Sequence, residues 1–207
     1  NIMDAFTSRV YFLRHGEIAA PGILSGQIDV ELSELGLKQM RQASAELINL
    51  NAIYSSPLKR CSVHADYLAN QHSLHVQYYN ALKEFNFGDW DGQDYQQLWQ
   101  QTSKPHIGDF WQHPWQVKVP NGESMADFYA RVDAWWQTFL QSLCESKHEQ
   151  SLVISHAGVI KQILAIVCQM PKQSATHLNV FHLPYAGLIT LDVYIDEQGQ
   201  AWPKIVF

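Results

Sequence analysis

Four basic side chains stand just beyond apolar runs of the sequence, where strands are expected to end. Arg14 and His15 follow the first run directly, His156 follows another, and Arg60 lies a short distance beyond a third. An arginine guanidinium presents a planar fork of donors that fits phosphate oxygens. A histidine can donate a hydrogen bond to phosphate, or its neutral imidazole can attack phosphorus. If these four side chains meet, they predict chemistry on a phosphate.

The elements that would position them alternate along the chain between strand patterns and helical patterns. Ser33 and Ser124 are good N-caps, and Pro57 suits the first turn of a helix. The alternation predicts an α/β fold with a largely parallel central sheet flanked by helices. We expect strands near residues 10–13, 51–56, 75–80, 151–155, 187–195 and 202–207, and helices near 34–50, 57–71, 124–143 and 157–169.

Such a sheet would bring the four side chains to one edge, because ligands of open α/β sheets bind beyond the carboxyl ends of the strands. The helix starts after Pro57 and His156 would add backbone N–H donors, and a protonated His156 would add positive charge. Gly16, beside His15, would leave space where a substrate must approach closely. Attack by His15 would also require an acid that protonates the leaving oxygen.

Length and charge narrow the class of protein and its partners. The 207 residues suit a single domain spanning 1–207, and 46% hydrophobic with 16% charged residues is typical of a globular chain. There are 14 Lys and Arg against 20 Asp and Glu, which gives a net charge of −6. Because an acidic chain has no general attraction for nucleic acid or anionic lipid, we expect neither as a partner. The positive charge that an anion needs must be local.

The cysteines and the N-terminal segment indicate the cellular compartment in which we expect the protein. Cys61, Cys144 and Cys168 lie far apart and form no CxxC pair, so we expect no disulfide framework, no zinc site and a reducing compartment. None has an arginine six positions later, as a cysteine-dependent phosphatase would require. No apolar run approaches the length of a membrane helix, and the first twelve residues lack the pattern of a signal peptide. We expect a cytoplasmic protein.

Five sequence blocks, in order, resemble the histidine phosphatase superfamily, whose fold is phosphoglycerate-mutase-like. They are "LRHGE", "SSPLKRC", "LKEFNFGDWDGQ", "NGES" and "ISHAGVIK", and they run from about Val10 to Lys161. The resemblance implies a three-layer α/β sandwich and a phosphatase that needs no metal ion and no cofactor. Within the superfamily, "SPLKRC" and "FGDWDGQ" with the Trp-rich segment after them are most similar to the alpha-ribazole phosphatases, although broad-range phosphatases share much of this pattern.

The resemblance also implies roles for individual residues. His15 would be the nucleophile that becomes phosphohistidine, and Glu84 would protonate the leaving group and then activate water. The residues expected to bind the phosphoryl group are Arg14, Arg60, His156 and, in a turn with Gly26, Gln27. On chemistry alone the acid could equally be Asp89, Asp91 or Asp94; only the family pattern selects Glu84.

Four positions depart from the family pattern. Ile18 stands where Ser or Thr is common, Pro21 where Asn is common, and Lys161 where Arg is common. The first two departures predict a phosphate cradle that lacks one of its usual groups. His64 stands where Thr is common, on the helix after Arg60, and either faces the pocket or packs elsewhere. The four basic residues at the strand ends are intact.

The expected substrate is a small phosphate monoester, alpha-ribazole 5′-phosphate in the first place. A phosphoglycerate mutase, a broad-specificity phosphatase and a non-catalytic phospholigand-binding protein are the alternatives, and the oligomeric state stays open. Residues 102–120 form the segment where specificity is expected, and one or two aromatics of Phe110–Trp115 could wall an organic leaving group. The histidines expected on the surface or in loops are His72, His75, His106, His113, His148, His177 and His182.

Overall fold

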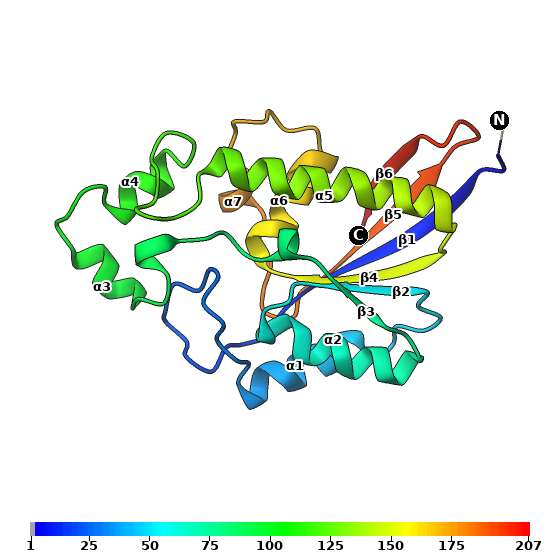
Figure 1. The fold of residues 1–207 in the computed structure, drawn as a ribbon, viewed down its shortest axis with the longest axis horizontal. Helices are drawn as coiled ribbons and strands as arrows, with labels where there is room; N and C mark the ends of the chain where they lie inside the picture. The colour runs from blue at the N-terminus through cyan, green and yellow to red at the C-terminus, as the bar shows by residue number, and fades with distance from the viewer. Residues whose placement is uncertain (1–2) are drawn as a thin grey trace.

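A six-stranded sheet lies at the centre of the computed structural model, which describes residues 3–207 (Figure 1). Asn1 and Ile2, which the expected domain 1–207 includes, lie outside the described residues. The strand order is β3-β2-β4-β1-β5-β6; the first four strands run parallel, and β5 and β6 run antiparallel. The strands are β1 Phe6–Arg14, β2 Ala52–Ser55, β3 Val76–Tyr78, β4 Gln150–Ser155, β5 Leu188–Ile195 and β6 Ala201–Val206.

The central strands are apolar because both of their faces are covered. Every residue of β2 is buried, as is every residue of β4 after the first. This burial explains why unbroken apolar runs predicted them correctly. In β1 the pattern predicted only Val10–Leu13, whereas the strand begins at Phe6. The start of β1 is paired along its whole length with β5 and from Arg9 onward also with β4, and Arg9 forms a salt bridge with Asp192 at 2.8 Å.

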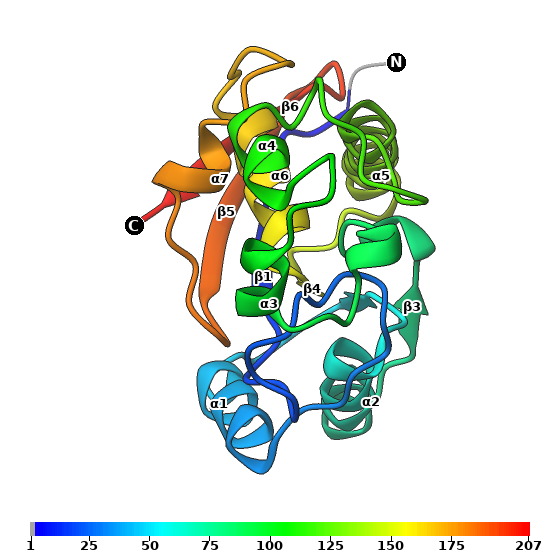
Figure 2. The same cartoon turned by 90° about the vertical axis from the view of Figure 1, so that its left-hand side faces the viewer.

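Helices cover both faces of this sheet, so the fold is the expected three-layer α/β sandwich (Figures 1 and 2). In β1, Val10 and Phe12 pack toward α5 and α6, whereas Leu13 packs toward α1 and α2. The α-helices are α1 Glu34–Ser44, α2 Lys59–His72, α3 Tyr95–Gln100, α4 Ile107–Gln112, α5 Met125–Ser146, α6 Ala157–Val167 and α7 His177–Val180, and two 3₁₀ turns are η1 Asn80–Leu82 and η2 Gly88–Trp90.

Two of the helix boundaries that differ from the sequence prediction have a clear local cause. The first helix was expected to reach residue 50 but ends at Ser44, whose hydroxyl bonds back to the carbonyl of Met40, and Asn49 then adopts a positive φ of 57°. Asparagine tolerates that left-handed conformation, and a continuing helix cannot contain it. Pro57 lies before α2 rather than in its first turn, because the extended Leu58 is the N-cap.

Two short helices, α4 and α7, were not expected from the sequence. The helix α4 lies within residues 102–120, where specificity was expected, and His106 caps it by accepting the N–H of Gly108 on its imidazole. The carboxylate of Asp109 accepts the N–H of His106 and completes a capping box. A histidine cap is uncommon, so the usual N-cap residues gave no signal here. The predicted caps Ser33 and Ser124 do accept N–H bonds at the starts of α1 and α5.

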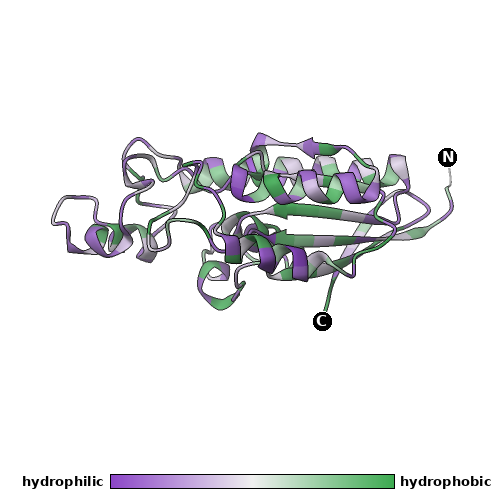
Figure 3. Cartoon of the chain, turned by 90° about the horizontal axis from the view of Figure 1, so that it is seen from below, coloured by the Kyte–Doolittle hydropathy of each residue, from purple (hydrophilic) through white to green (hydrophobic). Residues whose placement is uncertain are grey.

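The hydropathy of the elements follows this layering. Figure 3 shows largely green strands at the centre, with helices beside them that alternate between green and purple as amphipathic helices do. None of the helices within residues 3–207 combines the length and the apolar character needed to cross a bilayer.

The strand register gathers the ends of three parallel strands. Arg14 at the end of β1 is paired with Ser155 at the end of β4, and Ser55 at the end of β2 is paired with Ile154. The helices α3 and α4 lie beyond this edge of the sheet, at the left in Figure 1. The segment between β3 and α5 therefore covers the carboxyl edge of the sheet.

Candidate active site

The strand ends bring together the four basic side chains that the sequence singled out. His15 follows β1, His156 joins β4 to α6, and Arg60 lies in the first turn of α2. The two imidazole centroids are 5.2 Å apart. Arg60 and His156 are completely buried, and His15 is 4% exposed. Arg14 is partly buried and lines the cavity above them.

The imidazole of His15 is oriented by its own chain. Its Nδ1 lies 2.8 Å from the carbonyl oxygen of Gly16. A carbonyl oxygen only accepts, so Nδ1 carries the proton and Nε2 keeps its lone pair. Burial in the first place, and then the charge of Arg60, lowers the pKa of His15 to about 3. His15 is therefore neutral, with one nitrogen in the form that can act as a nucleophile.

Position 16 requires a glycine for a different reason from the one that the sequence suggested. A Cβ at this position would lie 2.1 Å from the carbonyl oxygen of Gly36 in the first turn of α1. The missing side chain therefore makes room for the backbone of α1, and the prediction that it admits a substrate is wrong.

His156 is buried and neutral. Its Nε2 lies 2.8 Å from the hydroxyl of Ser56, and its Nδ1 has no partner within the described residues. Burial, and then the charge of Arg60, holds the pKa of His156 well below its ordinary value. The prediction of a protonated His156 is therefore wrong, because burial and the neighbouring guanidinium of Arg60 oppose a positive charge there.

The two arginines are cations without carboxylate partners. Arg60 donates to the backbone carbonyls of Gly26 and Ile28, and Arg14 donates to that of Leu183 at 2.7 Å. Within residues 3–207 neither forms a salt bridge, and the Nε of each lacks a hydrogen-bond partner. Burial lowers the pKa of both guanidinium groups. Two partly desolvated cations at one point make a local site for an anion in an acidic chain.

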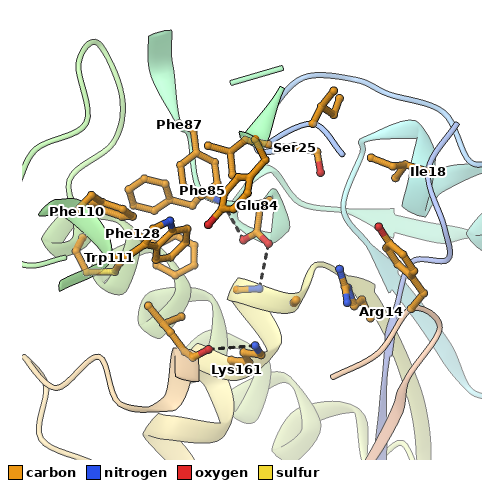
Figure 4. Close-up of a pocket in the computed structure, with 18 residues that line it drawn as sticks. Arg14, Ile18, Ser25, Glu84, Phe85, Phe87, Phe110, Trp111, Phe128 and Lys161 are labelled. Atoms are coloured by element: carbon orange, nitrogen blue, oxygen red, sulfur yellow. Dashed lines mark hydrogen bonds between the residues drawn. The ribbon is translucent and has the colours of Figure 1, made fainter. Parts of the chain in front are cut away.

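Glu84 reaches the same cavity from the loop after η1. Its Oε1 accepts the N–H of Phe85 at 2.9 Å, and its Oε2 accepts the N–H of Gly158 in the first turn of α6 at 3.0 Å (Figure 4). A Cβ at Gly158 would lie 2.4 Å from Oε1. Glycine is therefore required for this carboxylate to sit against the helix start.

The three competing carboxylates have other partners. Asp91 accepts the N–H groups of the turn formed by residues 26–28, Asp89 accepts from Asn121, and Asp94 caps α3. Each is thereby committed to a turn, a loop or a helix start. Of the four candidates for the acid, Glu84 is the one that lines the cavity.

The cavity above the strand ends has a volume of about 330 Å³ and two unlike sides. Arg14 and Lys161 contribute positive charge, and Figure 4 shows Glu84 between Arg14 and the opposite side. Aromatic side chains form that opposite side, as expected for an organic leaving group; they are Phe85, Phe87, Tyr95, Phe110, Trp111 and Phe128. Phe110 and Trp111 come from the segment predicted to set specificity.

Comparison with known proteins decides the family. The family model described as "Histidine phosphatase superfamily (branch 1)" matches residues 10–202. The chain belongs to the histidine phosphatase superfamily. It is an enzyme of the phosphatase class, like the relatives described next.

Relatives of this histidine phosphatase act on different esters, to judge by their names. It is 30% identical over 178 residues to the adenosylcobalamin/alpha-ribazole phosphatase of Escherichia coli (83% of this chain, 85% of that one). It is 31% identical over 153 residues to phosphoserine phosphatase 1 of Hydrogenobacter thermophilus (70% and 69%). A mycobacterial glucosyl-3-phosphoglycerate phosphatase, solved with VO3, is 25% identical with a TM-score of 0.81 (97% and 98%).

The groups of Gln27 in this histidine phosphatase are taken up by its own loops. Its backbone N–H donates to Asp91, and its side-chain amide donates to the carbonyl of Glu84 at 3.2 Å. The Gln27 side chain thus stabilises the loop that carries Glu84 through its backbone. The prediction that Gln27 binds phosphate finds no support in this arrangement.

Sequence reasoning missed two residues of the cavity. The ring of Tyr185 stacks on the guanidinium of Arg14 at 4.5 Å and lies 6.1 Å from the ring of His15. Lys161, noted in the sequence only as a departure, lines the cavity and donates to the carbonyl of Leu178 at 3.3 Å. Burial lowers its pKa. No short motif marks Tyr185, because the loop before β5 folds back over the end of β1 only in three dimensions.

Two further histidines are buried away from the reacting groups. His64 lies outside the cavity lining; its Nε2 is 2.8 Å from the hydroxyl of Ser44, and the contact joins α2 to α1. His177 was expected on the surface but is 2% exposed in α7. Burial lowers the pKa of each to about 4. Both are neutral residues of the interior.

Proposed function

We propose that this histidine phosphatase hydrolyses phosphate monoesters through a phosphohistidine on His15, with alpha-ribazole 5′-phosphate as its substrate. The observation that carries the proposal is the hydrogen bond from Nδ1 of His15 to the carbonyl of Gly16. It leaves Nε2 unprotonated, close enough to the guanidinium groups of Arg60 and Arg14 for their charges to act on His15. Nucleophile, charge and acid are the parts that phosphoryl transfer requires.

In the first step Nε2 of His15 attacks phosphorus, and the bond from phosphorus to the ester oxygen breaks. Glu84 delivers its proton to that oxygen, so the leaving group departs as an alcohol. Arg14 and Arg60 balance the charge on the phosphoryl oxygens, and His156 donates a hydrogen bond from Nδ1 while Nε2 accepts from Ser56. In the second step Glu84 takes a proton from water, the water oxygen attacks phosphorus, and the P–N bond breaks. His15 is restored and phosphate leaves.

The aromatic side of the cavity supports an aromatic leaving group. Phe85 packs against Phe87 and Phe110 with ring centroids 4.9 and 5.5 Å away, which forms a preformed apolar wall. A flat heteroaromatic base fits such a wall by stacking and by burial of apolar area. The name of the Escherichia coli relative, an adenosylcobalamin/alpha-ribazole phosphatase, supports the same substrate.

A broad-specificity phosphatase is the second candidate, and Lys161 favours it. Its ammonium group lies in the cavity near Arg14, where a leaving group that carries a carboxylate would find a partner. The phosphoserine phosphatase among the relatives points in the same direction.

The test is a parallel assay on alpha-ribazole 5′-phosphate, phosphoserine, 3-phosphoglycerate and sugar phosphates, without added metal. We expect the highest kcat/KM on the first; equal values across the set would favour the broad-specificity candidate. Mutase turnover with bisphosphoglycerate above the rate of hydrolysis would reject both. A labelled substrate quenched in alkali should leave phosphate on the wild-type protein and none on His15→Ala. Full activity in His15→Ala would exclude the phosphohistidine route.

A further inference from the structure

The loop that carries Glu84 is held by a side chain from a different layer of the fold. Arg131, on α5, donates from Nη1 to the carbonyls of Ala81 at 2.7 Å and Lys83 at 2.8 Å. Its Nη2 donates to the carbonyl of Glu84 itself at 3.0 Å. Residues 83–87 belong to no helix or strand, so regular backbone hydrogen bonds do not determine where they lie.

Glu123 orients the guanidinium that makes these contacts. Its two carboxylate oxygens accept from Nε of Arg131 at 2.6 Å and from Nη2 at 3.0 Å. Oε1 also accepts the N–H of Asn86 at 3.1 Å, and the N–H of Glu123 donates to the carbonyl of Asn86 at 2.9 Å. The side chains of Glu123 and Arg131 are 11% and 21% exposed. Because this two-point contact is largely shielded from solvent, it orients the guanidinium of Arg131 far better than a surface ion pair would.

We propose that Arg131 is the positioning residue for the acid of the reaction: it sets the backbone at residue 84 so that the carboxyl group meets the leaving oxygen. The inference rests on the proposed role of Glu84. The N–H groups of Gly158 and Phe85 bind the carboxylate oxygens of Glu84. The side chains of Arg131 and Gln27 bind its backbone carbonyl. Arg131 does not line the cavity around Arg14, so it reaches the reacting atoms through the loop that it holds and not by contact.

Arginine is required for this task because of its geometry. One planar group serves three carbonyls and a carboxylate at once, with donors that point in fixed directions. A lysine would keep the charge and could reach Glu123, but its single ammonium cannot span the carbonyls of Ala81 and Glu84 together. Arg131→Lys therefore separates positioning from charge.

The test measures kcat/KM on aryl and alkyl phosphates whose leaving groups range from p-nitrophenol to a simple alcohol. These values report the step that forms phosphohistidine. A poor leaving group needs the acid, whereas p-nitrophenolate departs without it. We expect Arg131→Lys to lose roughly 100-fold on the alkyl ester, as about 1 Å of misplacement costs, and less than about threefold on the nitrophenyl ester. Glu84→Gln should show the same dependence in stronger form.

Two further variants separate positioning from loss of folding. Arg41→Lys makes the same chemical change on the exposed side of α1 and should match wild type on every ester. In the double variant Glu84→Gln with Arg131→Lys, the loss should equal that of Glu84→Gln alone within about twofold, because the two act as one unit. Vanadate inhibition and thermal unfolding verify that the phosphate end and the fold persist. Glu123→Gln serves as a milder variant if Arg131→Lys unfolds.

A loss that is equal for all leaving groups, or one that adds to that of Glu84→Gln, would overturn the positioning role. The proposed function fails in a different way. In that case Glu84→Gln itself would show no dependence on the leaving group, whatever Arg131→Lys does.

Discussion

The two ends of the cavity are built on different principles. The phosphate end is formed by residues next to strand ends, such as His15 and His156, whose places follow from the register of three hydrogen-bonded strands. The leaving-group end is formed by loops and short helices, where Phe110 and Trp111 lie in the six-residue helix α4 and pack against other aromatics. The rigid end suits chemistry that every phosphate ester shares, and the loop-built end can differ between relatives without disturbing it.

The largest expected effect tests the phosphate end. Arg60→Lys removes the fork that donates to Gly26 and Ile28 and that is proposed to bind the phosphoryl group, so kcat/KM should fall roughly 1,000-fold on all esters alike. The measurement is steady-state hydrolysis of nitrophenyl and alkyl phosphates. Arg41→Lys is the matched control. A loss confined to one leaving group would show that the two ends are not separate in function.

The junction between the ends is the next point to test. Gly158→Ala would place a methyl group 2.4 Å from Oε1 of Glu84 and push the carboxyl group away from the start of α6. We expect kcat/KM on alkyl phosphates to fall about 100-fold, with a far smaller loss on the nitrophenyl ester. Competitive inhibition by inorganic phosphate should stay within about twofold of wild type. If phosphate binding falls as much as turnover, the substitution has damaged the phosphate end instead.

A smaller effect is expected at the leaving-group end. Trp111→Ala removes part of the aromatic wall, and KM for aryl phosphates should rise about tenfold, whereas kcat/KM for small alkyl phosphates changes less than about twofold. Trp99→Ala is the matched control, because Trp99 is 46% exposed and does not line the cavity. An equal loss on all esters would contradict the division between the two ends.

The smallest expected effect concerns the free energy of unfolding in acid. The buried histidines contribute to its pH dependence, whereas the aromatic wall does not. The pKa of His15 is about 3 and that of His64 about 4, below the 6.5 of the unfolded chain. Between these values the unfolded chain binds more protons, so the free energy of unfolding should fall as the pH decreases from about 6.5 toward 4. Each such histidine contributes at most about 1.4 kcal/mol per pH unit.

Urea unfolding between pH 7 and pH 4 measures this dependence. His64→Phe should flatten the fall in stability, and His75→Gln, at an exposed position, should leave it unchanged. An unchanged slope in His64→Phe would mean that this histidine is protonated to the same extent in both states.

Much of the phosphate end was open to prediction from the chain alone. Apolar runs predict strands, and polar residues directly after a run must lie at its end, so Arg14, His15 and His156 could be placed without coordinates. Ser33 and Ser124 marked helix starts correctly for an equally local reason, a hydroxyl within reach of the next turn. The α/β order of the elements followed from the same short-range patterns.

The rest depended on contacts between residues far apart in the sequence. Burial beside Arg60 makes His156 neutral, the backbone of Gly36 explains Gly16, and Glu84 is distinguished from three nearby aspartates by the N–H of Gly158. Periodicity reports which face of an element is buried, but not which group lies opposite. The sequence by itself determined the elements, the side chains at their ends and the kind of chemistry. Only the tertiary structure decided protonation, the contacts that hold the Glu84 carboxyl group and the shape of the leaving-group wall, because each depends on long-range packing and on the loss of water that packing causes.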